Sequence, residues 1–520
     1  MIDVLFRQTK ARFRRLTGNE HHRYVAIAVI TAFGLAVRLY LAFTNFCISG
    51  DGVGYIRMAR LFAAGKWWDA LSGVPSPLYP WLIALTHRVI SNWELAGELV
   101  SVAFGTAAVV AAWALMNEVY ECEQLSLCAA LLVAIHPRLA AYSASVLTEA
   151  GFIFLVVLSL YLFIRSLRRQ SLWETALAGV VSGISYLYRT EGIGFAIILT
   201  LFPLVAQRLS KKWSVGFGVR AAVTYGVAFG FVASPYLIYL RFATGHWLVG
   251  RELTAAVYYH MGEVSSSGER WRALAFENYA PILKPILEAP GLYAKKVATD
   301  LVMSFYDLVK ALEPLFAAAL VMGLWSGETA LGTNWKENLL GCVVLFYFVG
   351  LAFLYTGERF LAHYMTLTFG RVAMGISLAV RRLGGLKVFG RRLLRPEVLF
   401  AVIGLVTLPR TLWPLGYDMR GYRLAGIRIA HAIDKAGAVA ASDSRVAFYA
   451  GVEHVQLPNE PAPNLCGWLR EHPAVRFVVL SSREETGAKD PHKADCLSLW
   501  ERYPRYGRGY YDLFIVNEPR

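Results

Sequence analysis

Carboxylates and arginines recur at the ends of the apolar segments of this chain, and these residues could carry chemistry. Asp51 follows the first apolar segment, in CISGDGVGYIRMARLFAAGKWWDA, and Glu149 precedes another, in VLTEAG. Arg189 and Glu191 share the short stretch YRTEG. A carboxylate can act as a general base, and an arginine can hold a phosphate group. Charged residues at a membrane edge are costly and usually functional, so we expect these charges to surround one cavity.

A fourth charged stretch, TGERFLAHY, adds Glu358, Arg359 and His363 to the candidates. Arg189 and Arg359 are the first choices for binding a phosphate, because the planar guanidinium matches phosphate oxygens. A second interpretation is open for each position. The charges could be solvated loop charges, and Asp51 could merely cap the helix that follows it.

The composition is typical of a polytopic membrane protein. The 520 residues are 56% hydrophobic and 17% charged, whereas soluble domains carry about 25% charged residues. The net charge of +15 would suggest nucleic acid binding in a soluble protein. Lys and Arg also accumulate in the cytoplasmic loops of membrane proteins, so we expect membrane lipids and no nucleic acid as partners.

Apolar segments predict about eleven membrane-spanning helices, since one crossing takes about 20 mostly apolar residues. The expected segments are 24–46, 97–116, 125–142, 150–165, 174–187, 192–206, 218–240, 307–325, 338–355, 361–379 and 397–413. With this count, the basic tail and the basic loops near 165–169, 208–212 and 381–395 all lie on one side. The excess of positive charge on that side predicts a cytoplasmic N-terminus.

This topology divides the chain into three parts. Residues 1–23 form a basic cytoplasmic tail, and residues 24–414 form a transmembrane domain with long outer loops at 47–95 and 241–306. In residues 415–520, helical patterns alternate with the apolar runs AGAVAAS, RFVVLSS and YDLFIVN. That alternation predicts a small α/β domain with a largely parallel sheet, outside the membrane.

The first outer loop predicts an amphipathic helix after Asp51 that ends at Gly65 and lies in the membrane interface. One face collects Tyr55, Ile56, Ala59, Phe62 and Ala63 at helical spacing. Arg57 and Arg60 share another face, and they are second choices for the phosphate because contact with lipid headgroups explains them equally. Trp67 and Trp68 are expected at headgroup depth.

Aromatic and histidine side chains give weaker signals. Tyr55, Tyr79 and Tyr142 could bound a sugar pocket, although packing explains each of them as well. His136 and His363 could bind a metal, and His363 could contact a substrate. No HExxH or DxD motif supports a divalent metal, so no cofactor is assigned.

Two cysteines follow residue 414, Cys466 and Cys496. We expect both in helical patterns, one on each side of RFVVLSS. They could form a disulfide on the oxidising outer side or remain two buried thiols, because sequence does not determine their distance.

The order of these motifs resembles that of bacterial membrane glycosyltransferases of the GT-C fold, relatives of protein O-mannosyltransferases and of the aminoarabinose transferase that modifies lipid A. The motifs are DGxxY from residue 51, AR at 59, Gly65, SPLYP from 76, HP followed by TE, RxEG from 189, and ERFL. They extend over nearly the whole chain. The resemblance implies that Asp51 is the catalytic carboxylate and that Glu149 is a second acid. The family often has two consecutive acids in the first loop, whereas Gly52 follows Asp51 here.

A glycosyl transfer outside the cytoplasm needs a donor that crosses the bilayer, because nucleotide sugars are cytoplasmic. We therefore predict an inverting glycosyltransferase of the inner (plasma) membrane with a polyprenyl-phosphate sugar donor and a lipid, glycan or protein acceptor. Asp51 would be the base, Glu149 would orient the acceptor or Asp51, and Arg189 or Arg359 would bind the phosphate. The first alternative is a transporter or flippase of lipid-linked sugars, although no internal symmetry of that kind is visible. The second is an assembly protein that uses its C-terminal part as a binding module.

Overall fold

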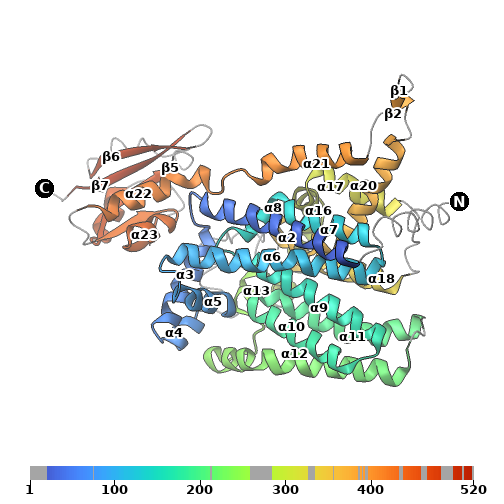
Figure 1. Ribbon diagram of the computed structural model, residues 1–520. Helices are drawn as coiled ribbons and strands as arrows, with labels where there is room; N and C mark the ends of the chain where they lie inside the picture. Colours follow the sequence, from blue (N-terminus) through green and yellow to red (C-terminus); the bar gives the residue numbers. More distant parts are fainter. Residues whose placement is uncertain are drawn as a thin grey trace.

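The computed structural model is a bundle of long helices with a small β-sheet at one end (Figure 1). The structure describes residues 20–73, 75–210, 213–257, 284–325, 334–354, 356–384, 387–388, 391–392, 396–432, 437–457, 465–481, 496–505 and 509–517. Most of the predicted basic tail, residues 258–283 of the second outer loop and much of the basic segment 381–395 lie outside the described residues.

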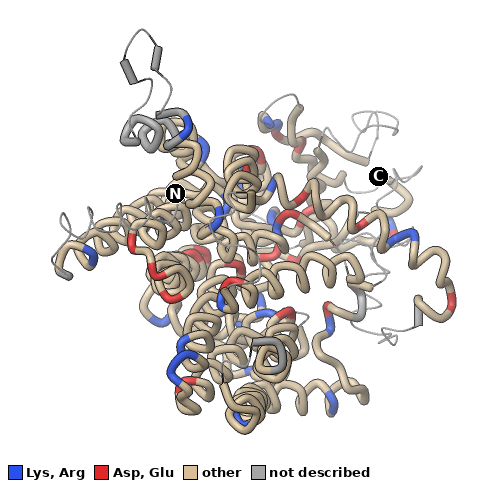
Figure 2. Tube along the Cα trace, turned by 90° about the vertical axis from the view of Figure 1, so that its right-hand side faces the viewer, with Lys and Arg blue, Asp and Glu red and all other residues tan. Residues whose placement is uncertain are grey.

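Among the described residues, six helices are long and apolar enough to cross a membrane, or up to eight if each of two bent helix pairs is one span. The six are α2 (Glu20–Phe43), α6 (Trp93–Tyr120), α9 (Glu149–Arg169), α11 (Ile193–Ser210), α12 (Val215–Thr244) and α18 (Trp335–Leu354). Figure 2 shows long stretches of helix without charged residues. The count of about eleven stays a prediction, because two expected spans lie in helices of 17 and 16 residues, α10 (Leu172–Tyr188) and α21 (Pro396–Thr411).

The predicted span 125–142 is broken at a proline. Its two halves, α7 (Glu123–Ile135) and α8 (Pro137–Ser143), meet at 59°. Pro137 has no N–H to donate to the carbonyl of Val133, four residues earlier. The fully buried Arg38 of α2 takes over that role, because its Nη2 donates to Val133 O at 2.9 Å and its Nη1 to Ala134 O at 3.1 Å.

The predicted span over 307–325 is not one continuous helix. Those residues belong to the end of α16 (Pro290–Leu312) and to α17 (Pro314–Trp325), which meet at 106°. Pro314 leaves the carbonyl of Lys310 without its helical donor, and Arg138 Nε donates to that oxygen at 3.0 Å.

The predicted span 361–379 is also discontinuous. It consists of the short helix α19 (Glu358–Met365), a 3₁₀ turn η2 (Thr366–Thr368) and α20 (Phe369–Gly384). The break separates the charged start of α19 from the long amphipathic helix α20. The remaining short elements are η1 (Thr190–Gly192), α13 (Arg251–Ala256), α15 (Lys284–Glu288), η3 (Tyr417–Met419), β1 (Lys387–Val388) and β2 (Arg391–Arg392).

The first loop forms three helices, α3 (Gly50–Ala63), α4 (Trp67–Leu71) and α5 (Leu78–His87). The expected apolar face of α3 is confirmed for Tyr55, Ile56, Ala59 and Phe62, which are buried, whereas Ala63 is exposed. Arg57 and Arg60 are exposed, as expected from their shared face. Gly65 follows the helix with a φ of 74°, a left-handed conformation that glycine adopts without strain.

The C-terminal part forms a five-stranded sheet in the order β4-β3-β5-β7-β6. Its elements are α22 (Arg420–Ala430), β3 (Ala438–Ala441), α23 (Arg445–Ala450), β4 (Glu453–Gln456), α24 (Leu465–Glu471), β5 (Val475–Ser481), β6 (Leu497–Pro504) and β7 (Tyr510–Val516). The three predicted apolar runs are the strands β3, β5 and β7. The expected largely parallel sheet is wrong in part, because β7 pairs antiparallel with both β5 and β6.

This sheet is docked on the first loop and on the start of α6. The hydroxyl of Tyr449, on α23, accepts from Ile48 N at 2.7 Å and donates to Glu94 Oε1 at 2.9 Å. The guanidinium of Arg60 lies 5.6 Å from the ring centre of Phe448. Figure 1 shows the sheet at the α3–α5 end of the bundle and the β1–β2 hairpin at the opposite end.

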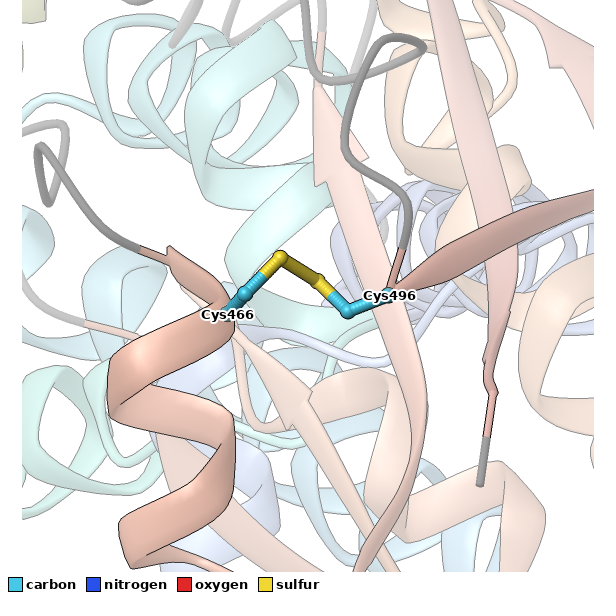
Figure 3. Close-up of a disulfide and its surroundings, with 2 residues drawn as sticks. All are labelled: Cys466 and Cys496. Atoms are coloured by element: carbon cyan, nitrogen blue, oxygen red, sulfur yellow. A yellow bond between two sulfur atoms is a disulfide. The ribbon is translucent and has the colours of Figure 1, made fainter. Parts of the chain in front are cut away.

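Cys466 and Cys496 are joined by a disulfide with a Cα–Cα distance of 5.7 Å (Figure 3). Cys466 lies in α24, as expected for a helical pattern. The expected helix around Cys496 is wrong, because this residue directly precedes strand β6. The bond therefore ties α24 to the edge of the sheet.

We expect neither C-terminal cysteine to react with a thiol reagent in unfolded, unreduced protein, and both to react after reduction. The bond spans a sequence separation of 30 residues, which predicts about 3–4 kcal/mol of stabilisation in the chain-entropy model. Mass spectrometry of labelled peptides checks this, with Cys47, Cys122, Cys128 and Cys342 as internal controls that label in both conditions. Labelling of Cys466 and Cys496 before reduction would contradict the bond.

Candidate active site

Asp51 lies in the first turn of α3 and faces a cavity of about 690 Å³. The interpretation of Asp51 as a helix cap is wrong, because Ser49 takes that role and accepts from Gly52 N at 3.1 Å. The side chain of Asp51 is 54% exposed. Its carboxylate is therefore open to the cavity while the helix is capped independently of it.

Glu149 is the first residue of α9, and its side chain is fully buried. One carboxylate oxygen, Oε1, contacts both Arg189 and Arg359. The other oxygen, Oε2, has no hydrogen-bond partner among the described residues. A buried carboxylate needs a paired cation, and the two arginines supply that charge to Glu149.

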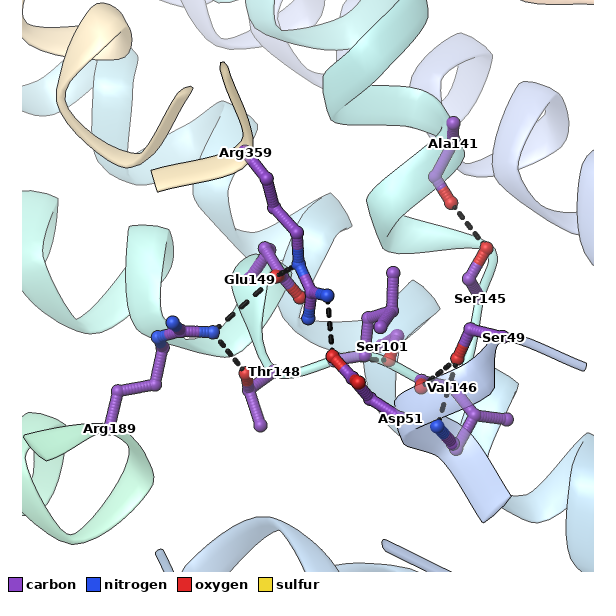
Figure 4. Close-up of polar contacts among 12 residues, drawn as sticks. Ser49, Asp51, Ser101, Ala141, Ser145, Val146, Thr148, Glu149, Arg189 and Arg359 are labelled. Carbon is purple, nitrogen blue, oxygen red and sulfur yellow. Dashed lines mark hydrogen bonds and ion pairs between the residues drawn. The ribbon is translucent and has the colours of Figure 1, made fainter. Parts of the chain in front are cut away.

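Arg359 joins the two carboxylates that the sequence analysis singled out. Its Nη1 donates to Asp51 Oδ2 at 2.5 Å, and its Nε donates to Glu149 Oε1 (Figure 4). Burial alone would lower the pKa of Arg359, but Glu149 and Asp51 hold that pKa well above its usual value. The guanidinium stays charged and fixes the distance between α3, α9 and α19.

Arg189 forms the second arginine contact, at the junction of α10 and η1. Its Nη1 donates to Thr148 Oγ1 at 2.7 Å and lies 3.4 Å from Glu149 Oε1 (Figure 4). Its Nη2 donates to Glu191 Oε1 at 2.6 Å. The structure thus brings all four expected charged stretches to one place.

Other expected residues occupy different places. Tyr55 lines the cavity, whereas Tyr79 is fully buried and its hydroxyl bonds to Gly97 O and Ser101 Oγ of α6. The remaining candidates do not line the cavity. They are Arg57 and Arg60 on the exposed face of α3, Tyr142 packed against the core, the buried His363, and Glu358, which pairs with Arg138 and Lys310.

The structure describes no group of three or more His, Cys, Asp or Glu residues able to hold a metal ion. His136, one of the two histidines considered as metal ligands, has its Nε2 3.2 Å from the carbonyl oxygen of Leu312. The other, His363, packs against the ring of Phe152 at a centroid distance of 5.1 Å.

Glu252 of α13 is a cavity residue that the sequence analysis missed. Burial, and to a smaller degree the nearby Glu191, raise its pKa to about 7, although Arg189 acts to lower it. Nothing in the spacing of the segment GRELTAA distinguishes this glutamate from an ordinary loop charge. Only its place in the lining of the same cavity, near Glu191 and Arg189, reveals it.

The C-terminal sheet contributes cavity residues that were also missed. They are Ser442, Asp443, Ser444, His454 and Gln456. A signal existed for part of this set, because ligands of α/β sheets bind at the carboxyl ends of parallel strands. Ser442 ends the predicted run AGAVAAS, and residues 442–444 directly follow strand β3.

Comparison with known proteins agrees with this architecture. Residues 74–239 match the family described as dolichyl-phosphate-mannose-protein mannosyltransferase. The oligosaccharyltransferase of Archaeoglobus fulgidus, solved with Zn and sulfate, superimposes with a TM-score of 0.60 at 15% identity, over 94% of this chain and 72% of that chain. The same archaeal enzyme in complex with an inhibitory peptide and a dolichol-phosphate gives 0.57 at 12% identity, over 95% and 74%.

ArnT from Cupriavidus metallidurans bound to undecaprenyl phosphate gives a TM-score of 0.55 at 12% identity, over 94% of this chain and 97% of that chain. A search of curated protein sequences found no match. At these identities the structural likeness shows the fold, and the family match over residues 74–239 adds the class of enzyme. The chain is a multi-pass membrane glycosyltransferase with the GT-C fold, and its residues 74–239 are similar to the dolichyl-phosphate-mannose-protein mannosyltransferase family.

Proposed function

We propose that this protein transfers a sugar, with inversion, from a polyprenyl-phosphate donor to the hydroxyl of an extracytoplasmic acceptor. The observation that carries the proposal is the bridge from Asp51 through Arg359 to the buried Glu149, with Asp51 and Arg359 both lining one cavity. It combines an accessible carboxylate with two arginines, Arg359 and Arg189. A base for a hydroxyl and a clamp for a phosphate are the two groups that this transfer needs.

The proposed step is a single displacement. The acceptor oxygen forms a bond to the anomeric carbon while the bond from that carbon to the phosphate oxygen breaks. The acceptor proton passes to Asp51, and the lipid phosphate leaves with its negative charge against Arg359 and Arg189. Attack opposite the leaving phosphate inverts the anomeric carbon, and no covalent sugar–protein intermediate is needed.

Glu149 acts as a positioning residue in this scheme. It is fully buried and contacts both arginines, so it orients them without needing to touch the acceptor. The apolar cavity residues Leu253, Ala256, Leu351 and Leu354 offer a wall to the first part of the lipid chain. Donor recognition would therefore combine an arginine clamp with apolar contact.

We place the site on the outer face of the inner (plasma) membrane. The basic loops support this orientation through the positive-inside tendency. The disulfide supports it as well, because such bonds persist in oxidising compartments. A polyprenyl-phosphate donor is what makes a sugar available on that side.

Topology can be tested with reporter fusions after residues 387 and 450. We expect residue 387 in the cytoplasm and residue 450 outside, because the β1–β2 hairpin and the C-terminal sheet lie at opposite ends of the bundle. A phosphatase reporter should be active only at 450, and a cytoplasmic fluorescent reporter only at 387. Activity of one reporter at both positions would refute the orientation and the outer active site.

The reaction is tested by transfer of labelled mannose from undecaprenyl-phosphate mannose to membrane-impermeant acceptors in proteoliposomes. Acceptors of the three expected kinds, lipid, glycan and peptide, are offered separately. Labelled product supports a transferase. Movement of intact donor across the bilayer without product would favour the transporter alternative.

Donor binding should weaken as the pH rises through about 7. Above the pKa of Glu252 the cavity gains a negative charge near Glu191 and Asp51, and Arg189 and Arg359 offset it only in part. We expect the Kd for undecaprenyl-phosphate mannose, whose phosphodiester charge is constant here, to rise about three- to tenfold between about pH 6 and about pH 8. Glu252→Gln should flatten that dependence; an unchanged pH profile in this variant would contradict the assignment.

A further inference from the structure

The cavity has a second wall, which belongs to the C-terminal sheet. We call Ser442, Asp443, Ser444, His454 and Gln456 the outer wall. It faces the same cavity as Asp51 and Arg359. A molecule that fills the cavity therefore touches the membrane helices on one side and the C-terminal sheet on the other.

The outer wall lies at a position where α/β sheets bind ligands. β3 pairs in parallel with β4 on one side and with β5 on the other. The chain leaves β3 through α23 and reaches β4 on one side of β3. It then returns through α24 and reaches β5 on the other side of β3. The turn 442–444 after β3 is thus at a topological switch point, where ligands settle outside the carboxyl ends of the strands.

Hydrogen bonds hold this turn in place before any ligand arrives. Arg445 donates to Asp443 through its backbone N and its Nε, at 3.0 and 2.8 Å, and through its Nη2 at 2.5 Å. Gln456 Nε2 donates to Ser442 O at 3.3 Å. A polar surface that is already ordered loses little conformational freedom on binding.

The chemistry of the outer wall suits hydroxyl groups rather than anions. It presents serine hydroxyls, an imidazole and an amide, which can donate and accept hydrogen bonds, and a carboxylate, which accepts them. Among the described cavity residues, the arginines are Arg189 and Arg359, both on the membrane side. Arg445 already neutralises Asp443 and does not itself line the cavity. An acceptor with a phosphate or carboxylate at the outer end would therefore meet no arginine or lysine among the described residues of this wall.

We infer that the outer wall is the acceptor subsite, and that the acceptor is a neutral saccharide whose ring hydroxyls bind there. This inference rests on the proposed function, since it assigns the second substrate of the same cavity. A ring held against residues 442–444 and Gln456 presents another hydroxyl to Asp51. The C-terminal sheet would select the acceptor, and the membrane helices would bind the donor.

The test uses the full-length protein in fluorescent nanodiscs on an array of neutral oligosaccharides, phosphorylated oligosaccharides and Ser/Thr-containing peptides. We expect binding to neutral oligosaccharides, and at least a tenfold loss of affinity in the double variant Ser444→Ala/Gln456→Ala. Ser444 makes no side-chain capping bond to α23, so its replacement preserves that helix. Ser498→Ala, on the exposed edge strand β6 of the same sheet, is the matched control and should bind like the wild type.

Failure of the inference is distinguishable from failure of the proposed function. Preference for peptides or phosphorylated oligosaccharides, or no binding of neutral oligosaccharides by the wild type, overturns the inference without any variant. Unchanged affinity in the double variant overturns it as well. Undecaprenyl phosphate binding is measured in parallel, and its absence in the wild type would instead overturn the donor assignment.

Discussion

Asp51→Asn should lower sugar transfer by at least two to three orders of magnitude while the protein still folds. Asparagine cannot accept the acceptor proton, and loss of a general base costs rates of this size. Folding should survive because Ser49, not Asp51, caps α3. Turnover is measured with saturating donor and acceptor in proteoliposomes, and thermal unfolding of the same preparations reports stability.

Asp69→Asn is the matched control for this change. Asp69 lies in the first turn of the neighbouring helix α4 and does not line the cavity. Asp69→Asn should leave turnover unchanged, because Asp69 also lies in a first helical turn but outside the cavity. If Asp51→Asn keeps near-normal turnover, Asp51 is not the base and the proposed mechanism fails.

Arg359→Ala should weaken binding of the lipid-phosphate donor by about 1.5–3 kcal/mol, roughly 10- to 150-fold in Kd. The variant removes a charged hydrogen-bond donor and frees Asp51 and Glu149 from their common partner. Arg189→Ala should have an effect of similar size, because Arg189 is the second cation beside Glu149. Donor titration monitored by thermal shift gives both constants.

Two further variants serve as controls. One keeps the charge at position 359 and changes its geometry, and the other removes an arginine outside the cavity. Arg359→Lys keeps the charge but cannot bridge two carboxylates with a planar fork, so it should recover only part of the lost affinity. Arg57→Ala removes an exposed arginine of α3 that does not line the cavity and should leave the donor Kd unchanged. If both Arg359→Ala and Arg189→Ala bind the donor with wild-type affinity, neither arginine binds the phosphate.

Local properties of the chain sufficed for the class of protein and for many of its elements. The long apolar segments predicted a membrane bundle, and the runs AGAVAAS, RFVVLSS and YDLFIVN are strands of the C-terminal sheet. The glycosyltransferase assignment, made from the order of weak motifs, is confirmed by the family match over residues 74–239. Apolar length is a property of neighbouring residues, and the alternation of elements and the order of motifs are read directly along the chain, so sequence alone carries all three.

Contacts between distant segments were decided by the tertiary structure. Asp51 and Arg359 are 308 positions apart, and only the tertiary fold brings the start of α3 and the start of α19 close enough for them to form an ion pair. The 106° bend after α16 and the outer wall of the cavity likewise depend on how distant segments pack together. The sequence by itself determined which residues could carry charge at the ends of apolar segments. Packing decided which of them meet, because a side chain's partners depend on how whole helices and the sheet fit together and not on spacing along the chain.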